Sequence, residues 1–165
     1  LKLLSIPVYA EEKRGMQPAD FPAKYPNALA MLLVNQLNKL EQFGKQRRDI
    51  AKYYWKALSW YSGITAPPLV DGASFLRYPM LVSDPEKMLR RAKEQGILLG
   101  NWYHNIVDPT GVDFAAIGYR VGLCPEAEKI AKHIINCPTT ISIKEAEQVV
   151  SAIISSQYGD IVGLR

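Results

Sequence analysis

The stretch CPEAEKIAKHIINCPTTISIKEAEQVVSAI, from Cys124 to Ile153, carries the clearest local signals of the chain and both of its cysteines. Pro125 suits the first turn of a helix, because its missing N–H would have no partner there. The apolar residues that follow recur at helical spacing, so we predict one helix from Pro125 that Cys137 and Pro138 end. Ser142 and Glu145 have the spacing of a capping box, which predicts a last helix from Lys144 to about Tyr158.

Cys124, His133 and Cys137 together resemble part of a zinc site. A structural zinc ion usually takes four ligands in close pairs, and the other histidine, His104, has no sequence signal that brings it near. On the predicted helix the two cysteines are roughly 18 Å apart, whereas a disulfide needs Cα atoms within about 7 Å. We therefore expect no metal and no disulfide, and we interpret both cysteines as small buried residues at the ends of a helix.

The composition is that of an ordinary globular domain: 165 residues, 48% hydrophobic, 22% charged, with a net charge of +4. The basic runs KQRR and RRAK lie in helical patterns without the interleaved aromatics typical of nucleic-acid binding. No apolar run approaches the ~20 residues of a membrane span. We expect no nucleic-acid or membrane partner and a cytoplasmic location. The chain does not begin with Met, so we expect it to be a piece of something longer.

A long helical pattern runs from about Tyr25 to Trp60, with Pro26 in its first turn and Gly44 as a point where it may bend. Such a helix would be roughly 50 Å long, but a compact chain of this size is only about 40 Å across. We therefore predict that the helix either overhangs the domain or is a spine that another domain or subunit covers. Residues 1–24 are interpreted as an irregular leading strap.

The middle of the chain alternates between strand and helix signals. Residues Phe75–Ser83 favour a strand, in which Pro79 indicates an edge or a bulge. Asp84 and Pro85 begin a helix that Gly96 ends, and Ile97–Val107 is interpreted as a second strand. The order of elements predicts an α+β fold with a long N-terminal helix and a small, mostly antiparallel or mixed sheet packed by helices.

Three segments resemble the DegT/DnrJ/StrS family of PLP-dependent sugar aminotransferases, which have the aspartate aminotransferase fold (fold type I). They are the stretch quoted above, the segment YPNALAMLLVNQLNKLEQFGKQRRDIAKYYWKAL, and more weakly EQGILLGNWY. Together they span about residues 24–155 in the order of the family. The resemblance implies that residues 25–165 are the small C-terminal domain, and that the large domain with the PLP-binding lysine lies outside this chain.

The resemblance also implies the function. The full-length protein would be a PLP-dependent transaminase acting on keto sugar nucleotides, in amino-sugar or polysaccharide biosynthesis, and would form a homodimer. This chain alone would not be catalytic, would contribute no catalytic residue and would bind no PLP by itself. The alternative is a stand-alone, non-enzymatic dimerisation or interaction domain that has kept the fold.

Four site residues follow from the resemblance. Lys24 and Asn27 would contact the cofactor phosphate, and Tyr103 and His104 would bind substrate at the mouth of the active site. The chain departs from the family pattern at Pro22, where the family often has an asparagine, and at Trp102, where the family has a histidine. The alternatives are a solvated helix entrance for Lys24, a polar first-turn residue for Asn27, and a strand-end tyrosine with a surface histidine for the other pair.

Overall fold

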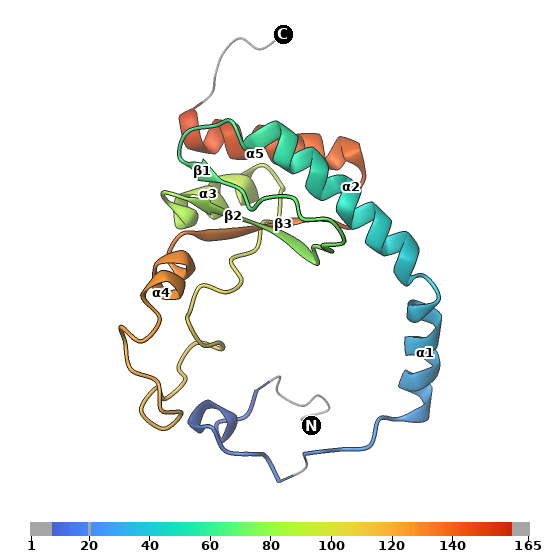
Figure 1. The fold of residues 1–165 in the computed structure, drawn as a ribbon, viewed down its shortest axis with the longest axis vertical. Coiled ribbons are helices and arrows are strands. Elements are labelled where there is room, and N and C mark those ends of the chain that lie inside the picture. Colours follow the sequence, from blue (N-terminus) through green and yellow to red (C-terminus); the bar gives the residue numbers. More distant parts are fainter. Residues whose placement is uncertain (1–7, 20, 160–165) are drawn as a thin grey trace.

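The computed structural model describes residues 8–19 and 21–159. A 3-10 turn, η1 (Glu12–Arg14), precedes helices α1 (Asn27–Leu37) and α2 (Leu40–Leu58). Strands β1 (Ile64–Thr65) and β2 (Arg77–Val82) come next, followed by α3 (Pro85–Glu94), α4 (Pro125–Ala131), β3 (Ile134–Pro138) and α5 (Ile143–Tyr158). Figure 1 shows α2 and α5 on one side of the sheet, and α1 and the strap leaving it in a wide arc.

The described strands form one antiparallel sheet in the order β1-β2-β3, which confirms the predicted α+β class. Asn136 of β3 exchanges both backbone hydrogen bonds with Gly100, at 2.7 and 2.8 Å, so its polar backbone groups point away from β2. Pro79 on β2 pairs with Asn136. The backbone nitrogen of Pro79, which has no hydrogen to donate, therefore points toward the β1 side of the sheet. The expected edge strand was wrong, because β2 is the central strand of the sheet. Since β1 reaches only Leu81 and Val82, no ladder bond is lost at Pro79.

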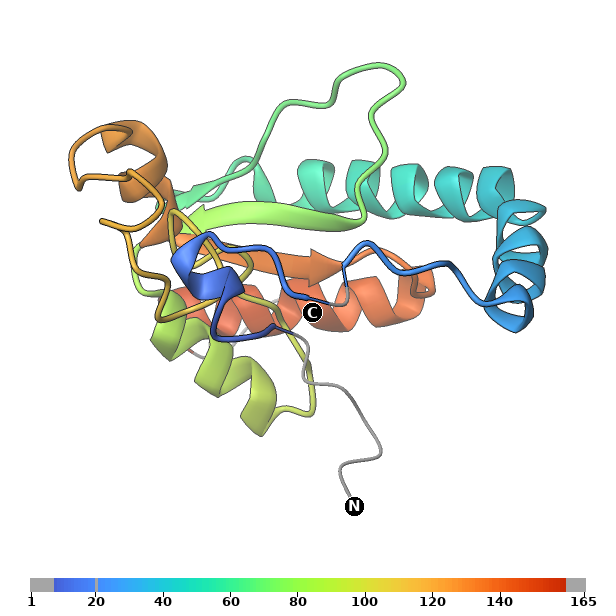
Figure 2. The same ribbon diagram turned by 90° about the horizontal axis from the view of Figure 1, so that it is seen from below.

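The core lies between one face of the sheet and helices α2, α3 and α5, which Figure 2 shows flanking the strands. On β2, alternate residues Tyr78, Met80 and Val82 are buried, while the residues between them are half-buried. Tyr54 of α2 is fully buried, and its ring stacks on Tyr78 with centroids 5.8 Å apart. The Tyr54 hydroxyl donates to the carbonyl oxygen of Pro138 at 2.9 Å, which ties α2 to the end of β3.

Two helix starts agree with the sequence signals. The side chain of Asp84 accepts a hydrogen bond from the backbone N–H of Lys87, and Gly96 follows α3 with a φ of +75°. Ser142 and Glu145 form the predicted capping box, with the Glu145 N–H 3.2 Å from the Ser142 hydroxyl and the Ser142 N–H 2.8 Å from the Glu145 carboxylate. These local contacts need no help from distant residues, which is why spacing alone predicted them.

The prediction of one helix up to Cys137 was wrong. Helix α4 ends at Ala131, and Ile134–Pro138 form β3, paired residue for residue with β2. Ile134 and Ile135 fit both a helix face and a strand, and pairing with β2 decides between them because it satisfies the backbone hydrogen bonds of a buried segment. Cys137 is fully buried on β3, as expected of a small residue, but Cys124 is exposed; both are free thiols.

Two further boundaries differ from the predictions. The expected single helix from Tyr25 to Trp60 is broken at Asn38 and Lys39 rather than bent at Gly44, which lies within α2. The expected strand Ile97–Val107 is mostly irregular, and its strand character is limited to the bridge between Gly100 and Asn136. The strap residues that the structure describes are irregular apart from η1; residues 1–7 and 20 lie outside the described part.

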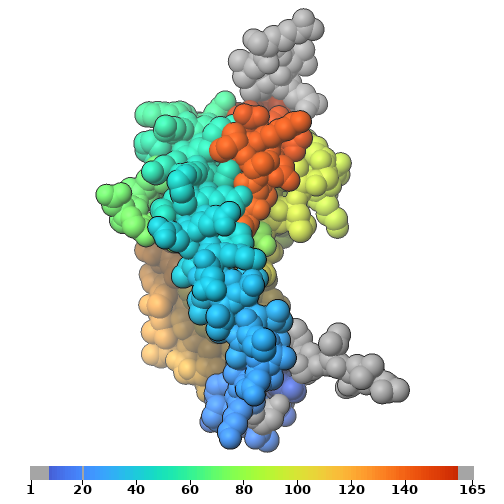
Figure 3. Space-filling view, turned by 90° about the vertical axis from the view of Figure 1, so that its right-hand side faces the viewer, coloured from blue at the N-terminus to red at the C-terminus, as the bar shows by residue number. Residues whose placement is uncertain are grey.

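Helix α1 is exposed along its whole length, and none of its residues is buried. The seven apolar residues Ala28–Val34 wind almost twice around the axis, so the helix is apolar on every side. Met31 is 76% exposed and Leu32 is 62% exposed, and Figure 3 shows α1 as a column at the surface that continues from α2. A helix that is apolar all round is normally enclosed by other protein. No helix in the described part is long and apolar enough to cross a bilayer.

Candidate functional site

The segment that follows Gly100 presents two large aromatic side chains to solvent. Trp102 is 57% exposed and Tyr103 is 65% exposed, and their rings lie stacked with centroids 6.5 Å apart. The guanidinium of Arg77, on the face of β2 opposite the buried core, lies 5.4 Å from the centroid of the Trp102 ring. This cation–π contact holds Trp102 against the sheet. Because Tyr103 stacks on Trp102, both exposed rings are positioned by Arg77.

His104 is the centre of a hydrogen-bonded cluster. Its Nε2 lies 3.1 Å from the Thr110 hydroxyl and 3.1 Å from the Asn105 amide nitrogen. The same amide nitrogen donates to Asp108 Oδ1 at 3.2 Å and to the Thr110 hydroxyl at 3.0 Å. Four side chains within seven residues therefore hold the segment together, and His104 itself remains exposed.

The strap binds to the same loop from a distance of almost one hundred residues in sequence. Lys13 Nζ donates to the Thr110 carbonyl oxygen at 2.9 Å, and the backbone N–H of Asp113 donates to the Lys13 carbonyl oxygen at 2.8 Å. Figure 1 shows the dark blue η1 beside this loop. The strap thus closes the arc that α1 begins, and the sequence carries no local signal for this contact because its two sides are almost one hundred residues apart.

A hollow of about 200 Å³ opens beside His104. Its lining combines two aromatic rings with an acid and a base: His104, Asn105, Ile106, Phe114, Tyr119, Val121, Glu128, Ala131 and Lys132. The Tyr119 hydroxyl and the Gly122 N–H both donate to Glu128, and these contacts, that of Tyr119 first, hold the pKa of Glu128 below its usual range. Burial, and next the contact with Glu128, raises the pKa of Tyr119 to about 12. The hollow therefore offers an ionised carboxylate and a protonated phenol near neutral pH.

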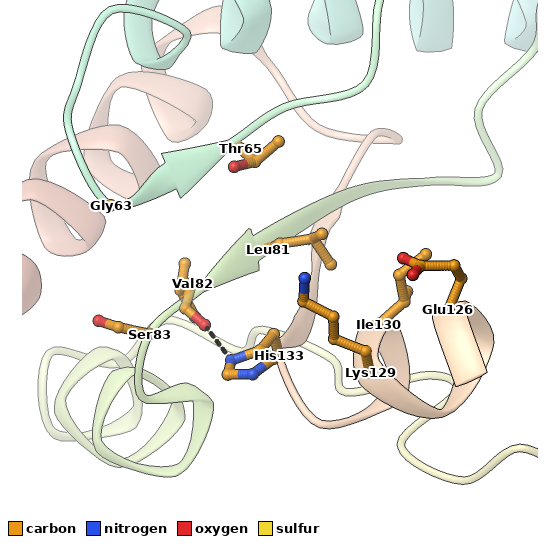
Figure 4. Close-up of a pocket in the computed structure, with 9 residues that line it drawn as sticks. All are labelled: Gly63, Thr65, Leu81, Val82, Ser83, Glu126, Lys129, Ile130 and His133. Carbon is orange, nitrogen blue, oxygen red and sulfur yellow. Dashed lines mark hydrogen bonds between the residues drawn. The ribbon is translucent and has the colours of Figure 1, made fainter. Parts of the chain in front are cut away.

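A second, larger hollow of about 460 Å³ lies where α4 faces the ends of β1 and β2. Figure 4 shows Glu126, Lys129 and Ile130 on α4 facing Leu81 and Thr65 on the strands. His133 Nδ1 donates to the Val82 carbonyl oxygen at 3.1 Å, which ties the end of α4 to β2. The sequence pattern pointed to His133 only as a possible zinc ligand, and the position of this side chain depends on the turn between α4 and β3.

The two predicted pairs of site residues lie on separate parts of the chain. Lys24 and Asn27 are exposed at the entrance of α1, and no hydrogen bond among the described residues links them to Tyr103 or His104. In Figure 1, the start of α1 and the loop after Gly100 lie on opposite sides of the arc. The N-terminus of α1 has no side-chain cap and no acidic residue in its first turn, and the exposed Lys24 lies three residues before the helix begins. The assignment of both pairs stays a prediction.

The part of the chain that the structure describes contains no group of three or more His, Cys, Asp or Glu side chains arranged to hold a metal ion.

The model of the DegT/DnrJ/EryC1/StrS aminotransferase family matches residues 9–154. The chain belongs to this family. A pleiotropic regulatory protein of Geobacillus stearothermophilus is 31% identical over 137 residues, which are 81% of this chain and 33% of that relative.

Solved structures share the fold. The sugar aminotransferase CalS13 from Micromonospora echinospora superposes with a TM-score of 0.62 and 21% identity, over 74% of this chain and 33% of its own. DesV of S. venezuelae, solved with a ketimine intermediate, gives a TM-score of 0.64 and 20% identity, over 80% of this chain and 36% of its own. This chain therefore spans about a third of the length of the relatives that it matches.

Proposed function

We propose that this chain is the small C-terminal domain, residues 25–165, of a PLP-dependent aminotransferase that acts on keto sugar nucleotides. The carrying observation is that the family match covers residues 9–154, nearly the whole chain, while the chain corresponds to only a third of its relatives. The rest of such an enzyme supplies the lysine that binds PLP, so this chain has no catalytic residue of its own. The family match and the neighbours do not favour the alternative of a stand-alone interaction domain.

The exposed apolar surface of α1 is an argument that this domain binds other protein in the complete molecule. An apolar helix without a single buried residue requires protein around it, and the large domain of the same polypeptide is the cover that the family relationship suggests. Because α1 is apolar on every side, one flat surface would leave part of it in water. A second subunit would complete the cover, which is consistent with a homodimer. The two free thiols accord with a reducing compartment such as the cytoplasm.

The entrance of α1 fits a phosphate of the cofactor. Uncapped N–H groups at a helix N-terminus bind anions, and Lys24 adds a cation two residues before Pro26, where no described acidic side chain competes. We infer that Lys24 and Asn27 hold this group in the assembled enzyme. When bound, PLP supplies the electron sink for amino transfer; the residues of this chain only bind and orient it.

The hollow beside His104 fits the polar surface of a sugar. The Phe114 and Tyr119 rings, the ionised Glu128 and the Lys132 ammonium combine apolar walls with charged hydrogen-bonding groups, which is the usual make-up of a specific small-molecule site. Tyr103 and His104 lie on the segment that forms one rim. We infer that this rim contacts the keto sugar nucleotide.

The test is the intact mass of the protein as its source organism makes it, after reduction with borohydride. We expect a chain much longer than 18.5 kDa that carries a reduced PLP group on a lysine outside these 165 residues. A mass near 18.5 kDa without an adduct would overturn the proposal in favour of the interaction domain. In the longer protein, Lys24→Ala should weaken PLP binding, whereas Lys56→Ala, an exposed lysine in the last turn of α2, should leave it unchanged.

A further inference from the structure

One residue of the strap holds the loop that carries His104 through two hydrogen bonds to its backbone. We call residues 104–117 the rim loop. Lys13 Nζ donates to the Thr110 carbonyl oxygen at 2.9 Å, and the Lys13 carbonyl oxygen accepts from the Asp113 N–H at 2.8 Å. The first bond has a charged donor and belongs to the stronger class of hydrogen bonds. Because a donor and an acceptor of one residue both engage the loop, they fix its orientation as well as its distance from the strap.

A close apolar contact lies beside these two bonds. Gly15 follows η1 with a φ of +72°, and a Cβ at this position would lie 3.1 Å from Ile117 Cγ2. Glycine adopts this backbone conformation without strain and leaves room for Ile117. The strap therefore meets the rim loop at its middle, through Lys13, and at its end, through Gly15.

The rim loop has few other anchors. Between the bridge at Gly100 and the contact of Tyr119 with α4, the hydrogen bonds that link the rim loop to other segments of the described chain are the two with Lys13. Thr110, whose carbonyl accepts from Lys13, also places its hydroxyl 3.1 Å from His104 Nε2. The position of His104 therefore depends on the strap.

The rim loop also forms one wall of the hollow beside His104. His104, Asn105, Ile106 and Phe114 line that hollow, whose volume is about 200 Å³. A change in the position of the loop changes the shape of this small space. Lys13 itself does not line the hollow, so it acts on the hollow only through the loop.

The strap is the short covalent path between the two pairs of predicted site residues. From Lys13, which holds the rim loop, the chain reaches Lys24 at the entrance of α1 in eleven residues. A segment of that length spans at most roughly 40 Å. The other path, from Asn27 through the core to Tyr103, takes more than seventy residues. Because the rim loop and the start of α1 lie on opposite sides of the arc in Figure 1, the strap limits how far apart they can move.

We propose that the strap is a clamp and that Lys13 is its positioning residue, which holds His104 and the wall of the hollow in place relative to the entrance of α1. In the assembled enzyme this clamp sets the distance between the group that binds the cofactor phosphate and the rim that contacts the keto sugar nucleotide. The role toward substrate rests on the proposed function; the clamp itself does not.

The experiment measures two NMR signals of the 165-residue chain: the hydrogen exchange of the Asp113 N–H, which reports its bond to Lys13, and the imidazole C–H signals of His104. Lys13→Met keeps the apolar stem and loses the donor, so we expect exchange at Asp113 to become about tenfold faster and the His104 signals to shift. The matched control is Arg14→Met, which removes the same charge from an exposed side chain of η1 that makes no hydrogen bond among the described residues. This control should change neither signal. His133 is the other histidine of the sequence, and its unchanged signals show that the variants are folded.

A second pair of variants tests the clamp without altering Lys13. Gly15→Val places a side chain against Ile117 and should reproduce both changes. Gly72→Val carries the same backbone strain, since Gly72 has a φ of +77°, but a Cβ there has no atom within 4 Å. We expect Gly72→Val to leave the Asp113 exchange and the His104 signals as they are.

In the longer enzyme, Lys13→Met should raise the KM for a keto sugar nucleotide about tenfold, with a smaller effect on kcat and none on PLP binding. Lys13→Arg, which keeps a charged donor, should restore most of the affinity. The clamp is refuted if Asp113 exchanges equally fast in Lys13→Met and Arg14→Met, or if its exchange becomes faster while the His104 signals do not move. The NMR signals and the borohydride mass are independent, so either proposal can fail while the other stands.

Discussion

The hydroxyl of Tyr54 makes a specific and measurable contribution to stability. Tyr54 is fully buried, and its hydroxyl donates to the Pro138 carbonyl oxygen at 2.9 Å. Pro138 pairs with Arg77, and at this pair the Pro138 carbonyl points away from β2. No hydrogen bond from β2 can therefore replace the one that the Tyr54 hydroxyl makes. The variant Tyr54→Phe keeps the ring and its stacking on Tyr78 but leaves a carbonyl without its donor.

Because Pro138 is half-buried, the expected cost is that of a typical intramolecular hydrogen bond, about 0.5–1.5 kcal/mol of the free energy of unfolding. For a chain of this size that corresponds to a fall in Tm of roughly 2–4 °C per kcal/mol. Urea unfolding followed by far-UV circular dichroism gives the difference directly, and the m value should not change because the surface exposed on unfolding is the same.

The matched control is Tyr158→Phe. That hydroxyl also donates to a backbone carbonyl, that of Ser62, but Tyr158 is 42% exposed, so water takes the place of the lost donor. We expect a change within about 0.5 kcal/mol. If Tyr54→Phe were no more destabilising than Tyr158→Phe, the inferred role of the buried hydroxyl would be wrong.

Three more predictions concern other parts of the fold. Burial raises the pKa of Tyr78 from 10.0 to about 12; the native state therefore keeps this proton where the unfolded chain loses it, and stability should fall between pH 10 and pH 12 by about 1.4 kcal/mol per pH unit from this group. Urea unfolding across that range should show a shallower fall in Tyr78→Phe, and an identical slope would contradict the assignment. Ser142→Ala removes the cap of α5 and should cost about 1 kcal/mol, whereas Ser151→Ala, an exposed site within the same helix, should cost nothing measurable; equal effects in thermal unfolding would argue against the capping box. Leu32→Gln should change the stability of the 165-residue chain by less than about 0.5 kcal/mol, because the side chain is already 62% exposed. In the longer protein that we propose, it should lower the Tm; a large loss in the 165-residue chain would mean that α1 packs on the rest of this chain.

Local signals identified most of the helices. Asp84 with Pro85, Ser142 with Glu145, and the glycine after α3 act within three or four residues, so their spacing carries the information. The length of the predicted helix indicated a segment that extends beyond the domain, and α1 is exposed, although the helix is divided into α1 and α2. The family resemblance, read from three segments, agrees with the match over residues 9–154.

Other features depend on partners that are remote in the sequence. Ile134 and Ile135 suit a helix or a strand. They form a strand because β3 pairs with β2, more than fifty residues earlier, on one side and with Gly100 on the other. The cluster around His104 needs the loop to fold back from Thr110 and the strap to bring Lys13 across. The sequence by itself thus determined where helices begin, which surface lacks cover and which family the chain resembles, because those signals are short-range or compositional. Only the tertiary structure decided the strand after α4, the exposure of Cys124 and the hydrogen-bonded cluster at His104, because each is set by contacts whose free energy appears only when distant segments meet.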